Sequence, residues 1–235
     1  MTTYRILALT AGLSTPSSTR MLTDQLSRAA AAALGRTGAE VEVTTVELRE
    51  HAHDITDALL TRFPGERLSM AIEQVRAADA VIAVTPVFNV GPSGLFTMFF
   101  DAVDIELWKD KPILLGATAG TARHSLAIDY AIRPMFGYLK AEIVPTSVFA
   151  ASADFGADTD GQADEQPLAA RVRRAAAELA TMIGAKTGER TAGAAGAEDA
   201  AAEAESAQAD APAATSTLDA EFSDFVPMGT LLGRD

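Results

Sequence analysis

The stretch YRILALTAGLSTPSSTR, residues 4–20, joins an aliphatic run to a loop that is crowded with hydroxyl groups. Residues 4–10 form a short apolar run followed by turn residues, so they predict a buried strand. Apolar residues then recur at three- and four-residue steps from Leu22 to Ala33, which predicts an amphipathic helix over about 18–35. The stretch therefore predicts a strand, a loop and a helix in immediate succession.

Strand-like and helix-like runs continue to alternate after this unit. Further strands are predicted over about 41–48, 79–87, 111–118 and 142–149. Further helices are predicted over about 66–78, 92–104, 124–140 and 167–185. Such alternation indicates a parallel sheet covered by helices on both faces, and right-handed crossovers restrict its strand order. We predict an α/β fold with a flavodoxin-like, doubly wound sheet of five parallel strands in the order 2-1-3-4-5.

Charge and cysteine content exclude several classes of function. The net charge of −13 argues against nucleic acid or an anionic membrane as the main partner, because both favour clustered Lys and Arg. The absence of cysteine excludes disulfides and thiolate metal sites. The sequence shows no apolar run near the roughly 18 residues of a membrane span and no signal-peptide pattern. We expect a soluble, cytoplasmic protein.

The composition changes near Lys186. Residues 187–235 contain ten acidic and two basic residues, so they carry most of the negative charge excess. The sequence predicts a folded domain over residues 1–186 and a low-complexity acidic tail after it, with disorder over about 187–214. The apolar patch LDAEFSDFVPMGTLL, residues 218–232, ends the tail. It is either a free end or a segment that docks on a neighbouring subunit or partner.

Three loops are expected to meet at one edge of the sheet. Ligands of doubly wound sheets bind beyond the carboxyl ends of the strands, where the strand order reverses. The loops that follow the first, third and fourth strands are TAGLSTPSSTR (10–20), TPVFNVGPSG (85–94) and ATAGTARHS (117–125). All three are rich in Gly, Ser, Thr or Pro, as loops around a cofactor would be.

The first of these loops predicts a phosphate site. The start of a helix offers free amides and the positive end of the helix dipole, and charge-assisted hydrogen bonds contribute roughly 1.5–3 kcal/mol each. One hydroxyl would be enough for a helix cap, which is the alternative interpretation. The glycine motifs for dinucleotides and nucleoside triphosphates are absent, so a mononucleotide fits best. The candidate residues are Ser14, Ser17, Ser18, Thr19 and Arg20.

The other two loops offer what a flat ring would need. The second loop gives a stiff apolar edge with one aromatic ring and one amide, on which an isoalloxazine could lie. This edge consists of Pro86, Val87, Phe88 and Asn89. The third loop offers backbone amides that can donate to the pyrimidine edge of a flavin and stabilise negative charge there. These amides belong to Ala119, Gly120 and Thr121.

Three segments, PSSTR (16–20), TPVFNVGPSGLFTMFFDAVD (85–104) and ATAGTARHSLAIDYAIRPMFGYLKAEIVPTSVFA (117–150), carry a resemblance to a known family. They resemble the NAD(P)H-dependent FMN reductases, flavodoxin-like enzymes that feed reduced flavin to two-component monooxygenases. The likeness is greatest to the reductases of luciferase-like monooxygenases and to the sulfonate-utilisation reductases. It covers about residues 4–182.

The resemblance implies the chemistry and the partners. It implies FMN with NADPH or NADH, hydride transfer to the flavin, a flavin-dependent monooxygenase as partner, and a homodimer or homotetramer. It adds Thr118 to the flavin-edge loop and places Tyr130 in an irregular helix at a subunit interface near the flavin. Leu13 and Thr15 stand where a Ser and an Arg are often seen, and Phe88 replaces the usual Tyr. No catalytic side chain and no metal site is predicted.

Proteins with other functions share this fold, so several alternatives to an FMN reductase remain open. A quinone, azo or chromate reductase would hold FMN tightly and reduce another acceptor. A flavodoxin-type electron carrier would exchange single electrons, but its compact Thr-x-Thr-Gly-x-Thr loop and flanking aromatic residues are missing here. A third possibility is an interaction module whose acidic tail is the working part.

Several polar residues carry weaker signals. His51 and His53 show no third metal ligand and are expected to be an exposed pair. Asp101 and Asp104 are expected on a solvated helix face. Arg123 is a candidate for a pyridine-nucleotide phosphate or for plain surface exposure.

Overall fold

Parallel strands form the centre of the computed structural model, which describes residues 2–155 and 167–204. The chain divides into two units, Met1–Glu189 and Arg190–Asp235. The sheet and the site belong to the first unit. Because strands buried on both faces must be apolar throughout, their sequences are nearly continuous aliphatic runs.

The strand order β2-β1-β3-β5-β6 confirms the predicted 2-1-3-4-5 topology. The parallel strands are β1 (Thr3–Thr10), β2 (Glu40–Glu47), β3 (Ala80–Phe88), β5 (Pro112–Ala119), β6 (Glu142–Ile143) and β7 (Val148–Ala151). The last two both pair with β5, so the predicted strand over 142–149 is divided. Pro145 lies between them and has no N–H to donate to the ladder.

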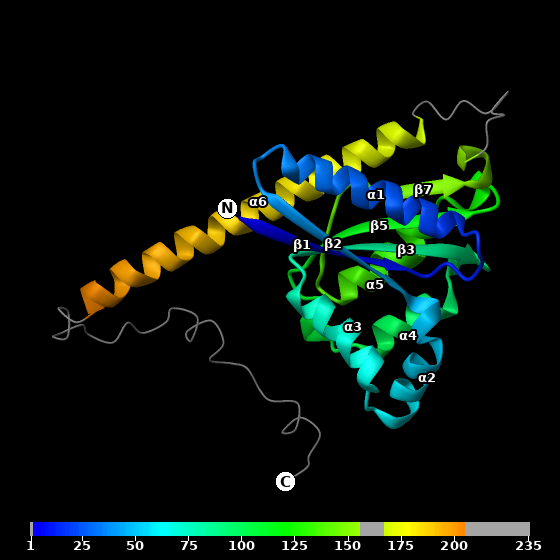
Figure 1. Cartoon of the computed structure of the whole chain (residues 1–235), viewed down its shortest axis with the longest axis horizontal. Coiled ribbons are helices and arrows are strands. Elements are labelled where there is room, and N and C mark those ends of the chain that lie inside the picture. The colour runs from blue at the N-terminus through cyan, green and yellow to red at the C-terminus, as the bar shows by residue number, and fades with distance from the viewer. Residues whose placement is uncertain (1, 156–166, 205–235) are drawn as a thin grey trace, which may run out of the picture. The chain divides into compact units, whose positions relative to one another are not determined.

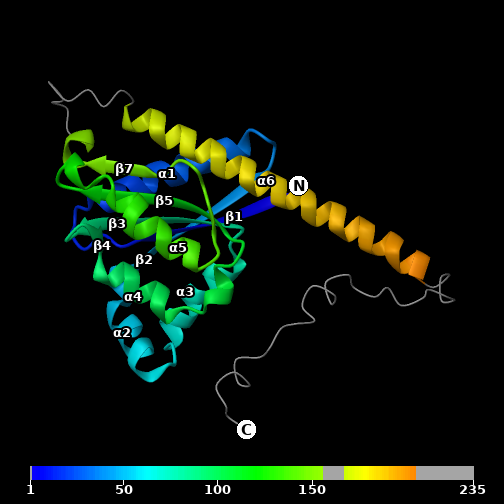
Figure 2. The same ribbon diagram turned by 180° about the vertical axis from the view of Figure 1, so that it is seen from behind.

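Helices cover both faces of the sheet (Figures 1 and 2). On one face lie α1 (Ser18–Gly35) and the start of α6 (Leu168–Ala204). On the other lie α2 (Ala52–Thr61), α3 (Glu66–Ala77), α4 (Gly94–Ala102) and α5 (Arg133–Tyr138). Across residues 2–155 and 167–204, none of the helices has the length and apolarity that a membrane crossing needs.

The structure adds elements that the sequence analysis did not predict. The helix α2 fills a stretch left unassigned, and β4 (Gly91–Pro92) pairs antiparallel with the end of β3. Short 3₁₀ turns occur at Leu48–His51, Ile105–Leu107, Ala122–His124 and Ser152–Phe155. The predicted helix over 124–140 is interrupted, because a π-helical segment, Ile128–Ile132, precedes α5.

The tail differs in part from its prediction. Residues 187–204, where composition predicts disorder, continue α6 as helix. Ala and Glu dominate this stretch and are strong helix formers, so a sequence that cannot build a core can still form a helix. The apolar patch at 218–232 lies outside the described residues.

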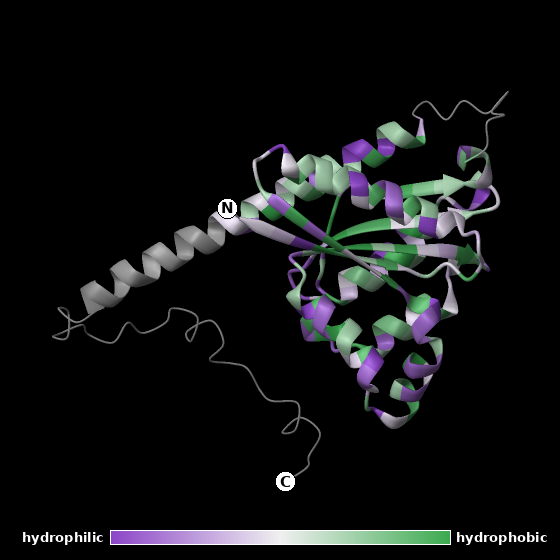
Figure 3. Cartoon of the chain, viewed as in Figure 1, coloured by the Kyte–Doolittle hydropathy of each residue, from purple (hydrophilic) through white to green (hydrophobic). Residues whose placement is uncertain are grey.

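The core beneath α4 is aromatic. The ring of Phe100 lies 4.8 Å from Phe96, 4.6 Å from Trp108 and 4.8 Å from Phe136, measured between ring centroids. All four side chains are buried. Figure 3 shows that the central strands are also mainly hydrophobic, as burial on both faces requires. This packing fixes the position of α4, which follows directly on the β3–β4 hairpin.

Replacing Phe100 with Ala should lower the free energy of unfolding by about 3–5 kcal/mol, because the loss of ring contacts adds to the cost of the cavity. Urea titration of the folded protein measures this change. The matched control is Phe63→Ala, since Phe63 is 78% exposed, and its effect should stay within about 0.5 kcal/mol. Equal effects of the two substitutions would contradict this account of the core.

Candidate functional site

An open cleft of about 360 Å³ lies at the carboxyl ends of β1, β3 and β5. Its lining residues are Leu13, Ser14, Ser17, Ser18, Thr19, Pro86, Val87, Phe88, Thr118, Ala119, Gly120 and Ser152. None of these carries a charged side chain. The cleft therefore offers hydroxyls, backbone groups and apolar surface to a ligand.

Most of the residues predicted from the sequence line this cleft. Arg20, Asn89, Thr121 and Tyr130 do not. The sequence analysis missed Leu13 and Ser152. Ser152 directly follows β7, whose carboxyl end lies at the same edge of the sheet as that of β5, so the loop after the last strand could have indicated it.

The loop before α1 is shaped by close packing and by a helix cap. Ser17 is the N-cap residue, and its Oγ accepts a hydrogen bond of 3.2 Å from the amide of Arg20. Ser18 and Thr19 are the first two residues of α1, so no carbonyl of the preceding helical turn accepts from their amides. These amides remain available as donors to a ligand. A Cβ atom at Gly12 would lie 2.1 Å from the Oγ of Ser17, so a larger residue there would displace the Ser17 side chain from its capping position.

A buried hydrogen bond joins the first loop to the third. The Oγ1 atoms of Thr19 and Thr118 lie 2.8 Å apart. Thr19 lies in the first turn of α1 and Thr118 lies near the end of β5, so this bond fixes the helix start against the sheet edge. It is a structural role that the sequence analysis did not assign to either threonine.

The second loop is a tight hairpin. Phe88 pairs with Gly91, which leaves Asn89 and Val90 as the two turn residues, with φ of 51° and 65°. Two-residue turns of the I′ type require positive φ at both positions. Asn tolerates this conformation and the β-branched Val does not, so the turn is strained at Val90. Ser93 anchors the hairpin by donating its amide to Thr85 Oγ1 at 3.0 Å.

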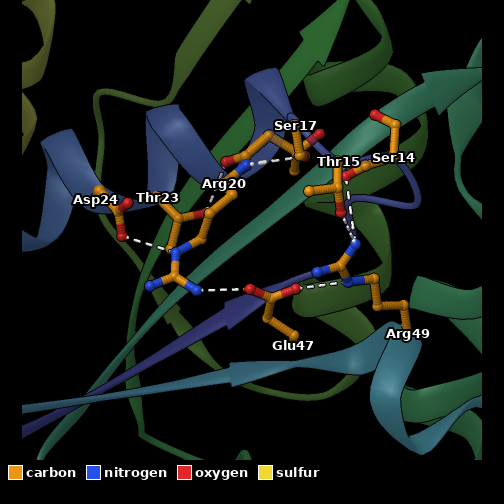
Figure 4. A network of polar contacts seen from close by, with 9 residues as sticks. Ser14, Thr15, Ser17, Arg20, Thr23, Asp24, Glu47 and Arg49 are labelled. Atoms are coloured by element: carbon orange, nitrogen blue, oxygen red, sulfur yellow. Dashed lines mark hydrogen bonds and ion pairs between the residues drawn. The ribbon is translucent and has the colours of Figure 1, made fainter.

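Arg20, which the sequence predicts as a phosphate ligand, pairs with two carboxylates in the structure. Its Nε lies 2.8 Å from Asp24 Oδ1 and its Nη1 lies 2.6 Å from Glu47 Oε1 (Figure 4). The hydrogen bond to Asp24 is the largest cause that raises the pKa of Arg20. The guanidinium is thus paired with two carboxylates and does not line the cleft, so the predicted phosphate fork stays a prediction.

The sequence did not indicate Arg49, which contacts the loop before α1 but does not line the cleft. Its Nε lies 2.6 Å from Glu47 Oε2, and its Nη1 donates to Thr15 Oγ1 at 2.5 Å (Figure 4). The Nη1 group also lies 3.4 Å from the carbonyl of Ser14. Arg49 follows β2, and the sequence analysis considered only the loops after the first, third and fourth strands.

Other predicted residues lie elsewhere on the surface. Tyr130 is 79% exposed on the π-helical segment, which agrees with the expected irregular helix.

His51 is only 15% exposed at its side chain, so the prediction of an exposed histidine pair is wrong for it. It sits in the 3₁₀ turn after β2, with Nδ1 at 4.0 Å from Asp54 Oδ2. The described part of the chain contains no cluster of side chains that could hold a metal ion.

Comparison with known proteins decides the family. A sequence model of the family described as NADPH-dependent FMN reductase matches residues 4–156. The chain belongs to this family. An FMN reductase (NADPH) of Pseudomonas aeruginosa is 30% identical over 184 residues, covering 78% of this chain and 95% of that protein. The NADH-dependent FMN reductase SfnE of Pseudomonas putida is 33% identical over the same length and coverage.

Solved structures agree with the fold. An oxidoreductase from Corynebacterium diphtheriae has a TM-score of 0.72 and 41% identity, covering 78% of this chain and 98% of that one. The apo form of the NADH:FMN oxidoreductase EmoB has a TM-score of 0.63 at 24% identity, covering 76% and 89%. The family places this FMN reductase among the NAD(P)H:FMN oxidoreductases, and the flavodoxin-like fold is confirmed.

Gly12→Ala should raise the KM for FMN at least about tenfold, because the new Cβ displaces Ser17 from the helix cap and from the cleft. Steady-state oxidation of NADPH with varied FMN measures the change. Gly184→Ala is the control, since nothing lies within 4 Å of a Cβ there. An unchanged KM in Gly12→Ala would show that the loop does not shape the flavin site.

Proposed function

We propose that this FMN reductase binds FMN in the cleft as a diffusible substrate and supplies reduced FMN to a two-component flavin-dependent monooxygenase in the cytoplasm. The observation that carries the proposal is the lining of the cleft, which combines hydroxyls and free amides with apolar surface and holds no charged side chain. Such a site can recognise a phosphate and a flat ring without holding them permanently.

The donors near α1 fit a phosphate monoester. Ser14, Ser17 and Ser18 line one cleft together with the free amides at the start of α1. The hydroxyl of Ser14 already donates to the carbonyl of Pro16 at 2.9 Å, so Ser17 and Ser18 supply the hydroxyl donors. A helix start with such donors is a ready anion site because the amides and the helix dipole both favour negative charge. Thr19 would contribute its amide, because its hydroxyl is already bonded to Thr118.

The opposite side of the cleft fits a flat ring. Pro86 and Val87 end a buried strand, and Phe88 is 48% exposed at the hairpin. At the end of β5, a Cβ atom at Gly120 would meet nothing within 4 Å, so the backbone there is open to a close approach. The amides of Ala119, Gly120 and Thr121 would donate to the polar edge of the flavin.

When bound, FMN accepts a hydride at N5 from C4 of the nicotinamide. The residues of this chain would bind and orient the two ligands, and none of those lining the cleft can act as an acid or base at neutral pH. Relatives named for NADH and for NADPH support both nucleotides as donors. A neutral cleft favours release, which is what a supplier of reduced flavin requires.

The proposal also includes association of the chain with copies of itself. Leu126, Tyr130 and Tyr138 are large side chains that are exposed on the segment from the third loop to α5. Exposed apolar residues grouped on one segment support a contact between copies of the chain, as a homodimer or homotetramer. Sedimentation velocity of the purified protein measures the assembly, and a monomer at micromolar concentration would contradict this part.

The decisive assay offers FMN, FAD, riboflavin and a quinone to the protein with NADPH or NADH. We expect FMN to be the preferred acceptor and the purified protein to lose its flavin on dialysis. We also expect the reductase, a nicotinamide and FMN to drive product formation by a monooxygenase that takes reduced FMN from solution. A protein that stays yellow and reduces only the quinone would contradict the proposal.

Ser18→Ala should raise the KM for FMN about tenfold and leave that for riboflavin unchanged, because one charge-assisted hydrogen bond to the phosphate is lost. Ser18 lines the cleft and caps nothing, so its loss should not alter folding. Ser69→Ala on α3, away from the cleft, is the matched control. Equal changes in the two KM values would place the phosphate elsewhere.

A further inference from the structure

Glu47 holds two arginines beside the proposed phosphate loop. Its Oε1 lies 2.6 Å from Arg20 Nη1, and its Oε2 lies 2.6 Å from Arg49 Nε (Figure 4). The carboxylate is 19% exposed, so water screens these contacts only in part. Asp24 holds the Nε of Arg20 as well, so two cations and two anions form one network of zero net charge.

The network contacts the loop through Arg49, whose Nη1 donates to Thr15 Oγ1. Arg20 itself lies in the first turn of α1, where its backbone amide donates to Ser17 Oγ. Ser17 lines the cleft, and Thr15 lies between Ser14 and Ser17 in the chain. Two positive charges therefore lie close to the proposed phosphate loop, and each is paired with a carboxylate.

We propose that Glu47 is a specificity-determining residue that lowers the affinity for the flavin phosphate by neutralising Arg20 and Arg49. The inference rests on the proposed function and deepens it. A phosphate carries close to two negative charges, and an unneutralised guanidinium would attract it strongly. A carboxylate at the same position reduces that attraction and shortens the residence of the flavin.

Two other roles for Glu47 predict different effects on the affinities for FMN and riboflavin. If Glu47 served only to position the loop through Arg49, its removal would loosen Ser14 and Thr15 and weaken the binding of FMN. If it served only the stability of the fold, its removal would affect FMN and riboflavin alike. Riboflavin lacks the phosphate, so the ratio of the two affinities separates these roles.

The test is Glu47→Gln, which keeps the shape of the side chain and removes its charge. Quenching of flavin fluorescence measures the Kd of FMN and of riboflavin in the full-length protein. The Kd of FMN should fall about threefold to tenfold, because Arg49 loses the charge of Glu47, Arg20 keeps only Asp24, and the network gains one net positive charge near the dianion. The Kd of riboflavin should not change, and the gain for FMN should shrink at high salt.

Two further variants sharpen the test. Glu42→Gln removes a carboxylate from the same strand, where Glu42 pairs with Arg5 away from the cleft, and should leave both Kd values unchanged. Asp24→Asn removes one of the two carboxylates on Arg20 and leaves Glu47 paired with both arginines, so it should lower the Kd of FMN less than Glu47→Gln does. A gain in Glu42→Gln equal to that in Glu47→Gln would overturn the inference, because it would reflect net charge alone.

The outcomes distinguish the inference from the function. If the wild-type protein binds FMN and reduces it, but Glu47→Gln weakens or leaves unchanged the binding of FMN, only the inference is overturned. If Glu47→Gln tightens FMN and riboflavin equally, the effect does not pass through the phosphate, and the inference is also overturned. If the wild-type protein neither binds nor reduces FMN, the proposed function falls first and the inference falls with it.

Discussion

The parallel register of β1, β3 and β5 is the constraint on which the rest of the structure depends. Thr10 pairs with Val84, and Pro86 pairs with Thr118, so three loops that are distant in the sequence leave the sheet at one edge. The buried bond between Thr19 and Thr118 then fixes the start of α1 at that edge. The cleft is a consequence of strand order more than of any single side chain.

A cleft without charged lining residues is a compromise between recognition and release. Hydroxyls and first-turn amides can select a phosphate, while Arg20 and Arg49 remain paired with carboxylates just outside. We interpret the network around Glu47 as the means by which a phosphate-recognising site can exchange its flavin.

The sequence predicts the strands and their order because apolar runs between turn residues are strong local signals. It predicts most of the cleft because topology assigns the loops. The sequence alone does not predict side-chain contacts between residues that only the fold brings together. Arg20 has the right position for a phosphate, yet Asp24 on its own helix and Glu47 on β2 hold it away. Arg49 reaches the loop only through the fold. The irregular helix around Tyr130 was expected from the family resemblance and not from a local sequence pattern.

The most direct test of the central claim is a crystal structure of the protein with FMN. The account predicts that phosphate oxygens lie about 2.7–3.2 Å from the amides of Ser18 and Thr19, with hydroxyls of the loop completing the contacts. It also predicts that the guanidinium of Arg20 remains on Asp24 and Glu47. A phosphate bound outside this loop, or an Arg20 that leaves Glu47 to bind the phosphate, would contradict the account.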